Sequence, residues 1–263
     1  MSYSTASLDE LEQLEAPQVG DTTSATICYP TEKSRVLLEP VPTKRLAFTD
    51  RYCVRKLICE GGQAKVHKAY DKVSCKEVAI KVYSKQEMKL RDLEAIHREK
   101  NIMETLSHPC VVQLRDFHED QEHIYMVMDL MLSDMRDLMI EVNAPVKERD
   151  ARSLFYHMVA SVQHIHQNQV IHRDLKLENF LIDEDKNSRQ IMVKLIDFGL
   201  ATFYDSECPP SQKCGTLVTV APEVFTAPHY DYKVDCWSLG VILFELLSND
   251  LPFFDKDAKK FKE

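Results

Sequence analysis

The chain has 263 residues, of which 44% are hydrophobic, and a formal net charge of −9 at pH 7. Its length suits one large domain or two small ones with a real core, and no apolar run approaches the roughly 18 residues that cross a membrane. The acidic balance argues against nucleic-acid binding and favours basic partners. Eight cysteines without a C-x-x-C pair favour reduced thiols and a cytoplasmic or nuclear location. We therefore expect no nucleic-acid partner and no membrane association.

Residues 1–47 differ in composition from the rest of the chain. They contain six acidic residues and no basic one before Lys33, with frequent Ser, Thr and Pro. Apolar periodicity is weak, which predicts a mostly disordered acidic leader. The segment has neither the basic nor the apolar region of a secretory signal, and Ser2 excludes the myristoylation motif. A regulatory leader and a merely solvated tail are both compatible with this pattern.

The next segment reads as a β-rich part with one helix. Residues 51–85 alternate in polarity or are β-branched, which predicts three strands, YCVRKLICE, KVHKAYD and KEVAIKVYS, with turns at 61–62 and 71–72. A helix is expected over about 93–106, because its apolar residues have helical spacing and the His-Pro pair at 108–109 ends it. Two more strands, VVQLRDFHE and HIYMVMDL, are expected next.

A helical part with a charged loop follows. One apolar stripe runs along residues 153–167, and the stretch VIHRDLKLENF stands at 170–180. A loop between a buried helix and a short strand can aim several polar groups at one point. Asp174 could accept a proton from a nucleophile, Lys176 could neutralise a developing negative charge, and Asn179 could hold a metal ion through its amide oxygen. A structural cluster of salt bridges is the alternative interpretation.

Four further motifs accompany this loop in a fixed order. VAIK at 78–81 precedes it, and DFG at 197–199, APE at 221–223 and DCWSLG at 235–240 follow it. Together with the order H-R-D-L-x-x-x-N, these motifs resemble those of the protein kinase family. The resemblance covers about residues 51–263.

The resemblance implies a fold class, namely α+β with the bilobal protein kinase fold. Its N-lobe would be β-rich with one αC-type helix, and its C-lobe mainly helical. The domain would span 48–263, with the N-lobe at about 50–128 and the C-lobe at about 129–263. Because the chain stops eleven residues after Pro252, we expect an incomplete C-lobe that lacks its last helices and the Arg that pairs with Glu223 in the family.

The resemblance also implies ATP and Mg²⁺ and gives roles to single residues. Lys81, paired with Glu99 on the single N-lobe helix, would hold the phosphates of ATP. Asp197 and Asn179 would hold magnesium. Asp174 would orient and deprotonate the substrate hydroxyl. By the same resemblance, Asp235 of DCWSLG would hold the backbone of the catalytic loop.

Further residues would surround the nucleotide. Met128 falls at the gatekeeper position, Asp129 and Met131 offer backbone bonds to adenine, and Asp134 falls where related kinases bind the ribose. The remaining lining would come from the glycine-rich turn and both lobes: Cys59, Gly61, Gly62, Val66, Ala79 and Leu181.

Other positions bear on the substrate. Two features are typical of serine/threonine kinases, namely Lys176 two residues after Asp174 and the sequence CGT before APE. By resemblance, Thr216 of CGT would bond the side chains of Asp174 and Lys176. The region 153–181 looks most like the calcium/calmodulin-dependent and calcium-dependent kinases, whereas the DLMLSD hinge looks more like the mitogen-activated and cyclin-dependent kinases. In the family, a Glu at the position of Glu178 often attracts a basic residue upstream of the phosphoacceptor. The resemblance therefore implies protein substrates that are basic near the phosphoacceptor.

Two segments depart from the family pattern. The glycine-rich loop should read G-x-G-x-x-G-x-V, but the chain reads CEGGQAKV. Cys59 and Ala64 therefore carry a Cβ that hinders positive φ and close approach of the backbone to phosphate. In the activation segment, Gln212 stands where related kinases often carry a phosphorylated Thr. Ser211 could substitute, and Arg173 offers a cation, so activity without phosphorylation or activation by another route is an open expectation.

A serine/threonine protein kinase, or its catalytic fragment, is the main interpretation. The rival is a non-catalytic, pseudokinase-like or truncated binding module, which the altered glycine loop and the missing end favour. The intact set Lys81, Asp174, Asn179 and Asp197 opposes it. A small-molecule kinase is disfavoured, because CGT and APE form a peptide-substrate surface in the family. The physiological substrate, the activator and the oligomeric state stay open.

Overall fold

The computed structural model describes residues 47–62, 64–86, 88–131, 133–184 and 191–253. The chain divides into two compact units, which meet in sequence at Asp50 and Arg51. The first unit is described only at residues 47–50, most of which belong to the short helix α2 (Phe48–Arg51). The acidic leader expected over 1–47 therefore lies almost entirely outside the described residues. All further elements belong to the second unit.

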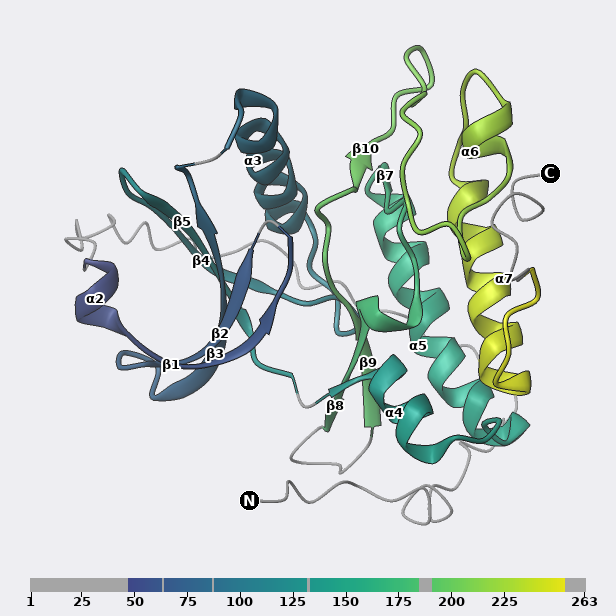
Figure 1. Ribbon diagram of the computed structural model, residues 1–263, viewed down its shortest axis with the longest axis horizontal. Coiled ribbons are helices and arrows are strands. Elements are labelled where there is room, and N and C mark those ends of the chain that lie inside the picture. Colours follow the sequence, from purple (N-terminus) through teal and green to yellow (C-terminus); the bar gives the residue numbers. More distant parts are fainter. Residues whose placement is uncertain (1–46, 63, 87, 132, 185–190, 254–263) are drawn as a thin grey trace, which may run out of the picture. The chain divides into compact units, whose positions relative to one another are not determined.

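Five antiparallel strands form the first sheet of this unit, in the order β1-β2-β3-β5-β4 (Figure 1). Strand β3 lies at the centre and buries Val78, Ala79 and Ile80 in succession. The first strand is exposed at every residue except Tyr52. The five strands are β1 (Tyr52–Glu60), β2 (Lys65–Asp71), β3 (Lys76–Ser84), β4 (Leu114–Glu119) and β5 (His123–Asp129).

The strand expected at VVQLRDFHE begins later than its apolar residues predict. Val111 and Val112 are buried, but their backbone pairs with strand β9 (Ile191–Leu195) instead of the first sheet. Val112 N donates to Leu195 O at 2.9 Å, and Leu195 N donates to Cys110 O at 2.8 Å. Strand β4 starts only at Leu114. The apolar pair therefore joins the segment after the helix to the second half of the unit.

Helix α3 (Leu90–Thr105) starts where Lys89 N donates to Asp92 Oδ2 at 3.0 Å, a capping contact at the helix N-terminus. The predicted helix is confirmed, with a start three residues earlier than the apolar spacing indicated. Its buried residues are Ile96, Glu99, Ile102 and Met103. Because a buried carboxylate is costly without a partner, Glu99 requires a charged or hydrogen-bonding neighbour across the helix–sheet contact.

The second half is mainly helical. Helix α5 begins at Glu148, earlier than expected, with Glu148 and Asp150 in its first turn, where acidic groups complement the helix dipole. It contacts β9 and α7. No described helix is long and apolar enough to cross a bilayer. The helical elements are α4 (Met135–Val142), α5 (Glu148–Gln167), the 3-10 turn η1 (Leu177–Asn179), α6 (Glu223–Thr226) and α7 (Lys233–Ser248).

Short strands frame the charged loop. One small sheet has the order β6-β8-β9, and another pairs β7 with β10. The charged stretch lies between β7 and β8, so a strand precedes it and another follows it, as Figure 1 shows. These strands are β6 (Ser133–Asp134), β7 (Val170–Ile171), β8 (Phe180–Glu184) and β10 (Thr202–Phe203).

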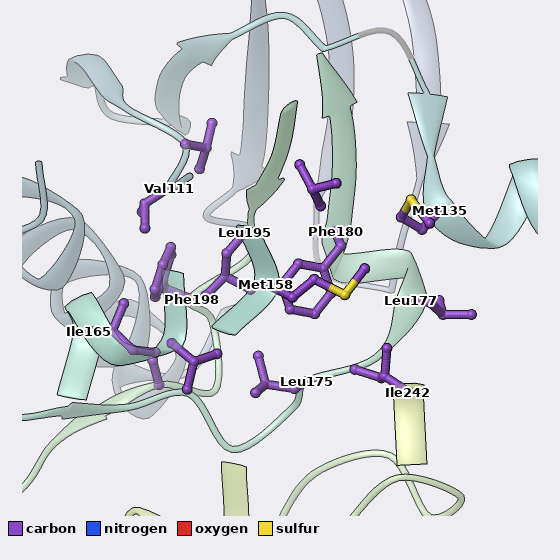
Figure 2. Packing of buried hydrophobic residues seen from close by; sticks show 14 of the residues in the cluster. Val111, Met135, Met158, Ile165, Leu175, Leu177, Phe180, Leu195, Phe198 and Ile242 are labelled. Carbon is purple, nitrogen blue, oxygen red and sulfur yellow. The ribbon is translucent and has the colours of Figure 1, made fainter. Parts of the chain in front are cut away.

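The hydrophobic core explains how that loop is held. Leu175 and Leu177 are fully buried, and they alternate with charged residues along the loop. Figure 2 shows them beside Met158 of α5, Phe180 of β8 and Ile242 of α7, all members of one buried cluster. The leucines therefore anchor the loop in the core while the residues between them stay available for polar contacts.

Candidate active site

A buried carboxylate on α7 fixes the backbone of the catalytic loop. Asp235 Oδ2 accepts from His172 N and Oδ1 accepts from Arg173 N, both at 2.9 Å, and His166 Nε2 lies 2.8 Å from Oδ2. Asp235 has no exposed surface. Arg173 has φ of 69°, a left-handed conformation that costs free energy in a non-glycine residue. The bonds to Asp235 hold this strained turn directly before Asp174.

Asp174 is bonded through both carboxylate oxygens. Thr216 Oγ1 donates to Oδ1 at 2.6 Å, and Lys176 Nζ lies 3.1 Å from Oδ2. Lys176 Nζ also donates to Thr216 Oγ1 at 3.2 Å. The preceding Gly215 has φ of 107°, and a Cβ there would lie 2.7 Å from Arg173 O, so only glycine fits. The CGT segment thereby brings Thr216 against the catalytic loop from 42 residues away.

Asn179 is oriented by the same loop. Its Nδ2 donates to the backbone oxygen of Asp174 at 2.8 Å, so the amide oxygen is the atom that remains for a cation. Asn179 O accepts from Ile196 N at 2.9 Å. This bond ties η1 to the segment immediately before Asp197. Asn179 and Asp197 are therefore held on two directly bonded backbone segments.

Lys81 on β3 connects α3 to the DFG segment. Its Nζ lies 2.9 Å from Glu99 Oε1 and 2.8 Å from Asp197 Oδ1. Burial alone would favour the neutral amine, but the two carboxylates raise the pKa of Lys81 above its usual value. The Lys81 cation in turn lowers the pKa of Asp197 to about 2. The site thus holds a charged ammonium in contact with the carboxyl groups of Glu99 and Asp197.

The oxygen donors fit magnesium that is shared with phosphates. Asp197 uses Oδ1 for Lys81, and Asn179 retains its amide oxygen. Mg²⁺ prefers oxygen ligands and is usually held by one or two protein groups together with substrate phosphates and water. Within the described ranges, no group of three or more His, Cys, Asp or Glu side chains forms a protein-only metal site. The Asp197 carboxylate and the Asn179 amide match a magnesium site in which protein groups and substrate phosphates hold the ion together.

The glycine-rich turn closes as a tight connection between β1 and β2. Gly61 N donates to Ala64 O at 2.9 Å, and Cys59 pairs with Val66. Neither Cys59 nor Ala64 has a positive φ, so the turn closes without strain at these two positions, and the expectation that their Cβ atoms hinder close approach to phosphate stays a prediction. The side chains of both residues still add bulk to this turn. Burial raises the pKa of the Cys59 thiol, which favours the neutral form.

The predicted hinge residues lie on strands β5 and β6 or between them. Met128 on β5 pairs with Ala79 of β3, and Asp129 binds Arg115 at 2.6 Å through its side chain. Asp134 pairs with Leu181 across β6 and β8. Its Oδ1 also accepts from Asp137 N at 2.8 Å, which makes Asp134 the N-cap of α4. Burial raises the pKa of Asp134, and the backbone hydrogen bond from Asp137 partly offsets this effect.

Met131 follows β5 and is partly buried, and Gly62 is exposed at the glycine-rich turn. A Cβ at Gly61 would make only an ordinary contact, 3.6 Å from Ala64 O, and a Cβ at Gly62 would meet nothing within 4 Å. Neither glycine is required by local packing. Gln63, between Gly62 and Ala64, lies outside the described residues.

Two polar residues at the site were not predicted. Tyr83 donates to Glu99 Oε2 at 2.7 Å, so both oxygens of this buried carboxylate are bonded. Its place two residues after Lys81 on the same strand face was a usable signal. Arg136 on α4 binds the catalytic-loop residue Glu178 at 3.2 Å and also forms an ion pair with the buried Glu245 of α7. No spacing rule connects these three positions.

The family model for the protein kinase domain matches residues 52–263. The chain is 34% identical over 213 residues to a probable serine/threonine-protein kinase KIN1 homolog of Encephalitozoon cuniculi, covering 78% of this chain and 37% of that protein. It is 32% identical over 246 residues to the ovarian-specific serine/threonine-protein kinase Lok of Drosophila melanogaster, covering 88% and 51%. It is 35% identical over 203 residues to serine/threonine-protein kinase SIK2 of Gallus gallus, covering 77% and 25%.

The chain belongs to the protein kinase domain family. This match confirms the fold class that the motifs implied, a β-sheet N-lobe followed by a helical C-lobe. The chain spans about half or less of the length of these curated relatives. Their names identify them as serine/threonine kinases, and this likeness applies to the shared domain.

Proposed function

We propose that this domain transfers the γ-phosphoryl group of ATP, with Mg²⁺, to serine or threonine hydroxyls of protein substrates. The observation that carries the proposal is the joint placement of the charged groups. Lys81 contacts both Glu99 and Asp197, although Asp197 lies 116 residues away. The backbone bond from Ile196 to Asn179 joins this triad to the loop that carries Asp174.

Each of these residues has a defined task in the proposed reaction. Lys81 supplies a fixed cation for the phosphates, and Glu99 orients it. Asp174 orients the substrate hydroxyl and accepts its proton, while Lys176 offsets negative charge beside it. Asn179 and Asp197 would hold Mg²⁺, which neutralises charge on the phosphates. Catalysis therefore consists mainly of positioning and electrostatic stabilisation, with a smaller contribution from proton transfer.

The test uses the whole chain of 263 residues. Nucleotide binding is measured with and without Mg²⁺, and transfer is measured with labelled ATP and a serine/threonine peptide. We expect Mg²⁺-dependent binding and labelled peptide. Nucleotide binding without any transfer would contradict the enzymatic proposal and support a non-catalytic binding module.

That binding module is the second candidate, and one observation favours it. The glycine-rich turn carries Cys59 and Ala64 in place of glycines, and the Cys59 side chain lies within electrostatic reach of Lys81 and Asp197. Bulk at this point opposes close approach of the turn to phosphates. The complete charged triad of Lys81, Glu99 and Asp197 weighs against the module, because this arrangement has a direct use in phosphate binding.

We also propose that the substrates are basic near the phosphoacceptor. The Glu178 carboxylate is 44% exposed beside the catalytic loop, and Asp134 and Asp137 lie near it at the start of α4. Arg136 partly neutralises Glu178, since its guanidinium is shared between Glu178 and Glu245. A basic substrate residue would therefore compete with Arg136 for one exposed carboxylate within an acidic surrounding.

Two finer proposals rest on the sequence. The loop HRDLKLENFLI supports membership of the calcium/calmodulin-dependent and calcium-dependent kinase group, and calcium-dependent activation of the whole protein would test it.

A cytoplasmic or nuclear location is supported by the seven described cysteines, all of which are free thiols. Fluorescence microscopy of the tagged protein tests that location directly.

A further inference from the structure

His229 and Tyr230, which precede α7 in the chain, form hydrogen bonds with the activation segment, the part of the chain between DFG and APE. His229 Nδ1 lies 3.1 Å from Pro209 O, and Tyr230 N donates to Pro210 O at 3.1 Å. Tyr230 also donates through its hydroxyl to Gln212 O at 2.6 Å. Three carbonyl oxygens within four residues are thereby bonded by two neighbouring residues. All of these contacts are made by neutral backbone carbonyls and need no phosphate.

The same hydroxyl reaches the catalytic loop from its other side. Arg173 Nη1 donates to Tyr230 Oη at 3.1 Å, and Arg173 Nε donates to Leu200 O at 2.7 Å. Arg173 is only 7% exposed and directly precedes Asp174. Among the described residues it forms no ion pair with a carboxylate. One phenolic oxygen therefore accepts from the catalytic loop and donates to the activation segment.

Packing fixes the position of this oxygen. Tyr230 is 5% exposed and belongs to a buried apolar cluster with Ile171, Ala221, Val224 and Val234. Burial raises the pKa of Tyr230, so its hydroxyl keeps the proton that it donates to Gln212. Ile171 lies two residues before Arg173 on β7, and Val234 lies on α7 beside Asp235. The ring is thus held by the same elements that hold the catalytic loop.

We propose that Tyr230 is a positioning residue that couples Arg173 to the activation segment and keeps this segment in place without phosphorylation. The inference rests on the proposed kinase function. A hydrogen bond from a charged donor contributes more than a neutral pair, and a buried guanidinium without an acceptor is costly. Leu200 O accepts from Nε of this guanidinium, and the Tyr230 hydroxyl accepts from Nη1. The bond from Tyr230 to the Gln212 carbonyl then links Arg173 to the segment that carries Thr216.

The first experiment compares Tyr230→Phe with Tyr232→Phe. Tyr232 packs against the same cluster, and the structure gives its hydroxyl no hydrogen bond within the described residues, so this variant is a matched control. Wild-type activity toward a serine/threonine peptide should be unchanged after treatment with a protein phosphatase. Tyr230→Phe should lower kcat roughly 10-fold, the effect of one charged hydrogen bond, with little change in ATP affinity. Tyr232→Phe should match the wild type.

A charge-rescue variant separates positioning from general stability. Gln212→Glu places a carboxylate on the segment that Arg173 reaches through Tyr230. In the Tyr230→Phe background it should restore most of the lost activity, whereas in the wild type it should change little. A hydroxyl that only stabilised the fold would not be replaced by a distant carboxylate. Failure of rescue, or an unaffected Tyr230→Phe enzyme, overturns the inference.

A readout that does not need catalysis keeps the two proposals distinguishable. Lys213 is exposed on the activation segment, so tryptic cleavage after it reports how firmly the segment is held. Cleavage should be faster in Tyr230→Phe than in Tyr232→Phe and should slow again with Gln212→Glu. Equal cleavage rates, or a wild-type enzyme that phosphatase inactivates, overturn the role of Tyr230. Absence of peptide phosphorylation combined with the expected cleavage pattern overturns only the proposed kinase activity.

Discussion

Asp174 shows how much of the proposed chemistry depends on one side chain. Replacing it with Asn keeps the shape and an oxygen for Thr216 but removes the negative charge and the proton acceptor. We expect kcat for peptide phosphorylation to fall by about 10²–10⁴-fold, the usual contribution of a general base, with ATP affinity preserved. Steady-state kinetics and a nucleotide-binding titration measure the two effects. Transfer at the wild-type rate would refute the role of Asp174.

Glu178 provides a second test, of substrate choice. Glu178→Gln removes the carboxylate that faces Arg136 and solvent. A basic substrate residue near the phosphoacceptor should therefore contribute less to kcat/KM. The ratio of kcat/KM for a peptide with Arg to one with Gln at that place should fall about two- to fivefold, in line with an exposed charge pair worth up to about 1 kcal/mol.

The control for this test is Glu148→Gln. Glu148 pairs with Arg152 at 3.2 Å, the same distance that separates Arg136 from Glu178, but it lies at the start of α5 in an exposed pair. Its replacement should leave the peptide ratio unchanged. An unchanged ratio in Glu178→Gln as well would mean that Arg136 already satisfies Glu178.

At residue scale, a motif that fixes both identity and spacing predicts which side chains meet in the fold. The roles proposed for Lys81, Asp174 and Asp197 came from ordered motifs, and that of Glu99 came from its place on the helix before the His-Pro pair. The structure brings Lys81 into contact with Glu99 and Asp197. The buried partner Tyr83 and the bridging Arg136 were missed. Their contacts depend on how helices and strands pack, which no local pattern records.

At the scale of elements, the glycine-rich turn is the clearest departure from the family pattern. The double variant Cys59→Gly with Ala64→Gly removes two Cβ groups from it and frees the backbone to approach phosphates. We expect tighter MgATP binding, by a few-fold, in a calorimetric titration. Because the turn needs no positive φ at either position, the gain should come from approach to phosphate and not from relief of strain.

Cys53→Gly is the matched control for that variant. It adds the same flexibility to β1 but at an exposed residue that pairs with Tyr70, away from the turn. It should leave nucleotide affinity unchanged and cost roughly 0.5–1 kcal/mol of stability, as glycine does inside a strand. Equal affinities for the double variant and the wild type would show that the two side chains do not limit binding.

Element boundaries were less predictable than element types. The three strands across 51–85 are present because alternation and β-branching reflect burial on a sheet. The strand expected from Val111 was misplaced, since its backbone pairs with Leu195 of β9, 84 residues further along the chain. A local apolar run shows that a segment is buried, but the partner of its backbone is decided by the tertiary fold.

At the scale of the whole molecule, Asp235 connects elements that are distant in sequence. From α7 it accepts hydrogen bonds from His172 and Arg173 in the catalytic loop and contacts His166 at the end of α5. The motif DCWSLG predicted the contact with the loop, but not the contact with α5. A single buried carboxylate therefore links the longest helix of the second half, the catalytic loop and α7.

Asp235→Asn should weaken these contacts while keeping a side chain of the same size. An amide has one accepting oxygen, so at least one of the two backbone N–H groups loses its partner at a cost of about 1–3 kcal/mol. Urea unfolding should show a lower midpoint with an unchanged slope, and peptide phosphorylation should fall as well, because the strained turn at Arg173 is no longer held before Asp174.

Asp231→Asn is the control for this variant, because it makes the same substitution four residues earlier, in the segment just before α7. Its Oδ1 accepts from Lys233 N at 2.9 Å, a bond that an Asn oxygen makes equally well, so both stability and activity should stay close to the wild type. If Asp235→Asn behaved like Asp231→Asn, the loop would have to be held by its buried leucines alone. The core around Leu175 and Leu177 would then be sufficient to place Asp174, and the carboxylate on α7 would be dispensable for catalysis.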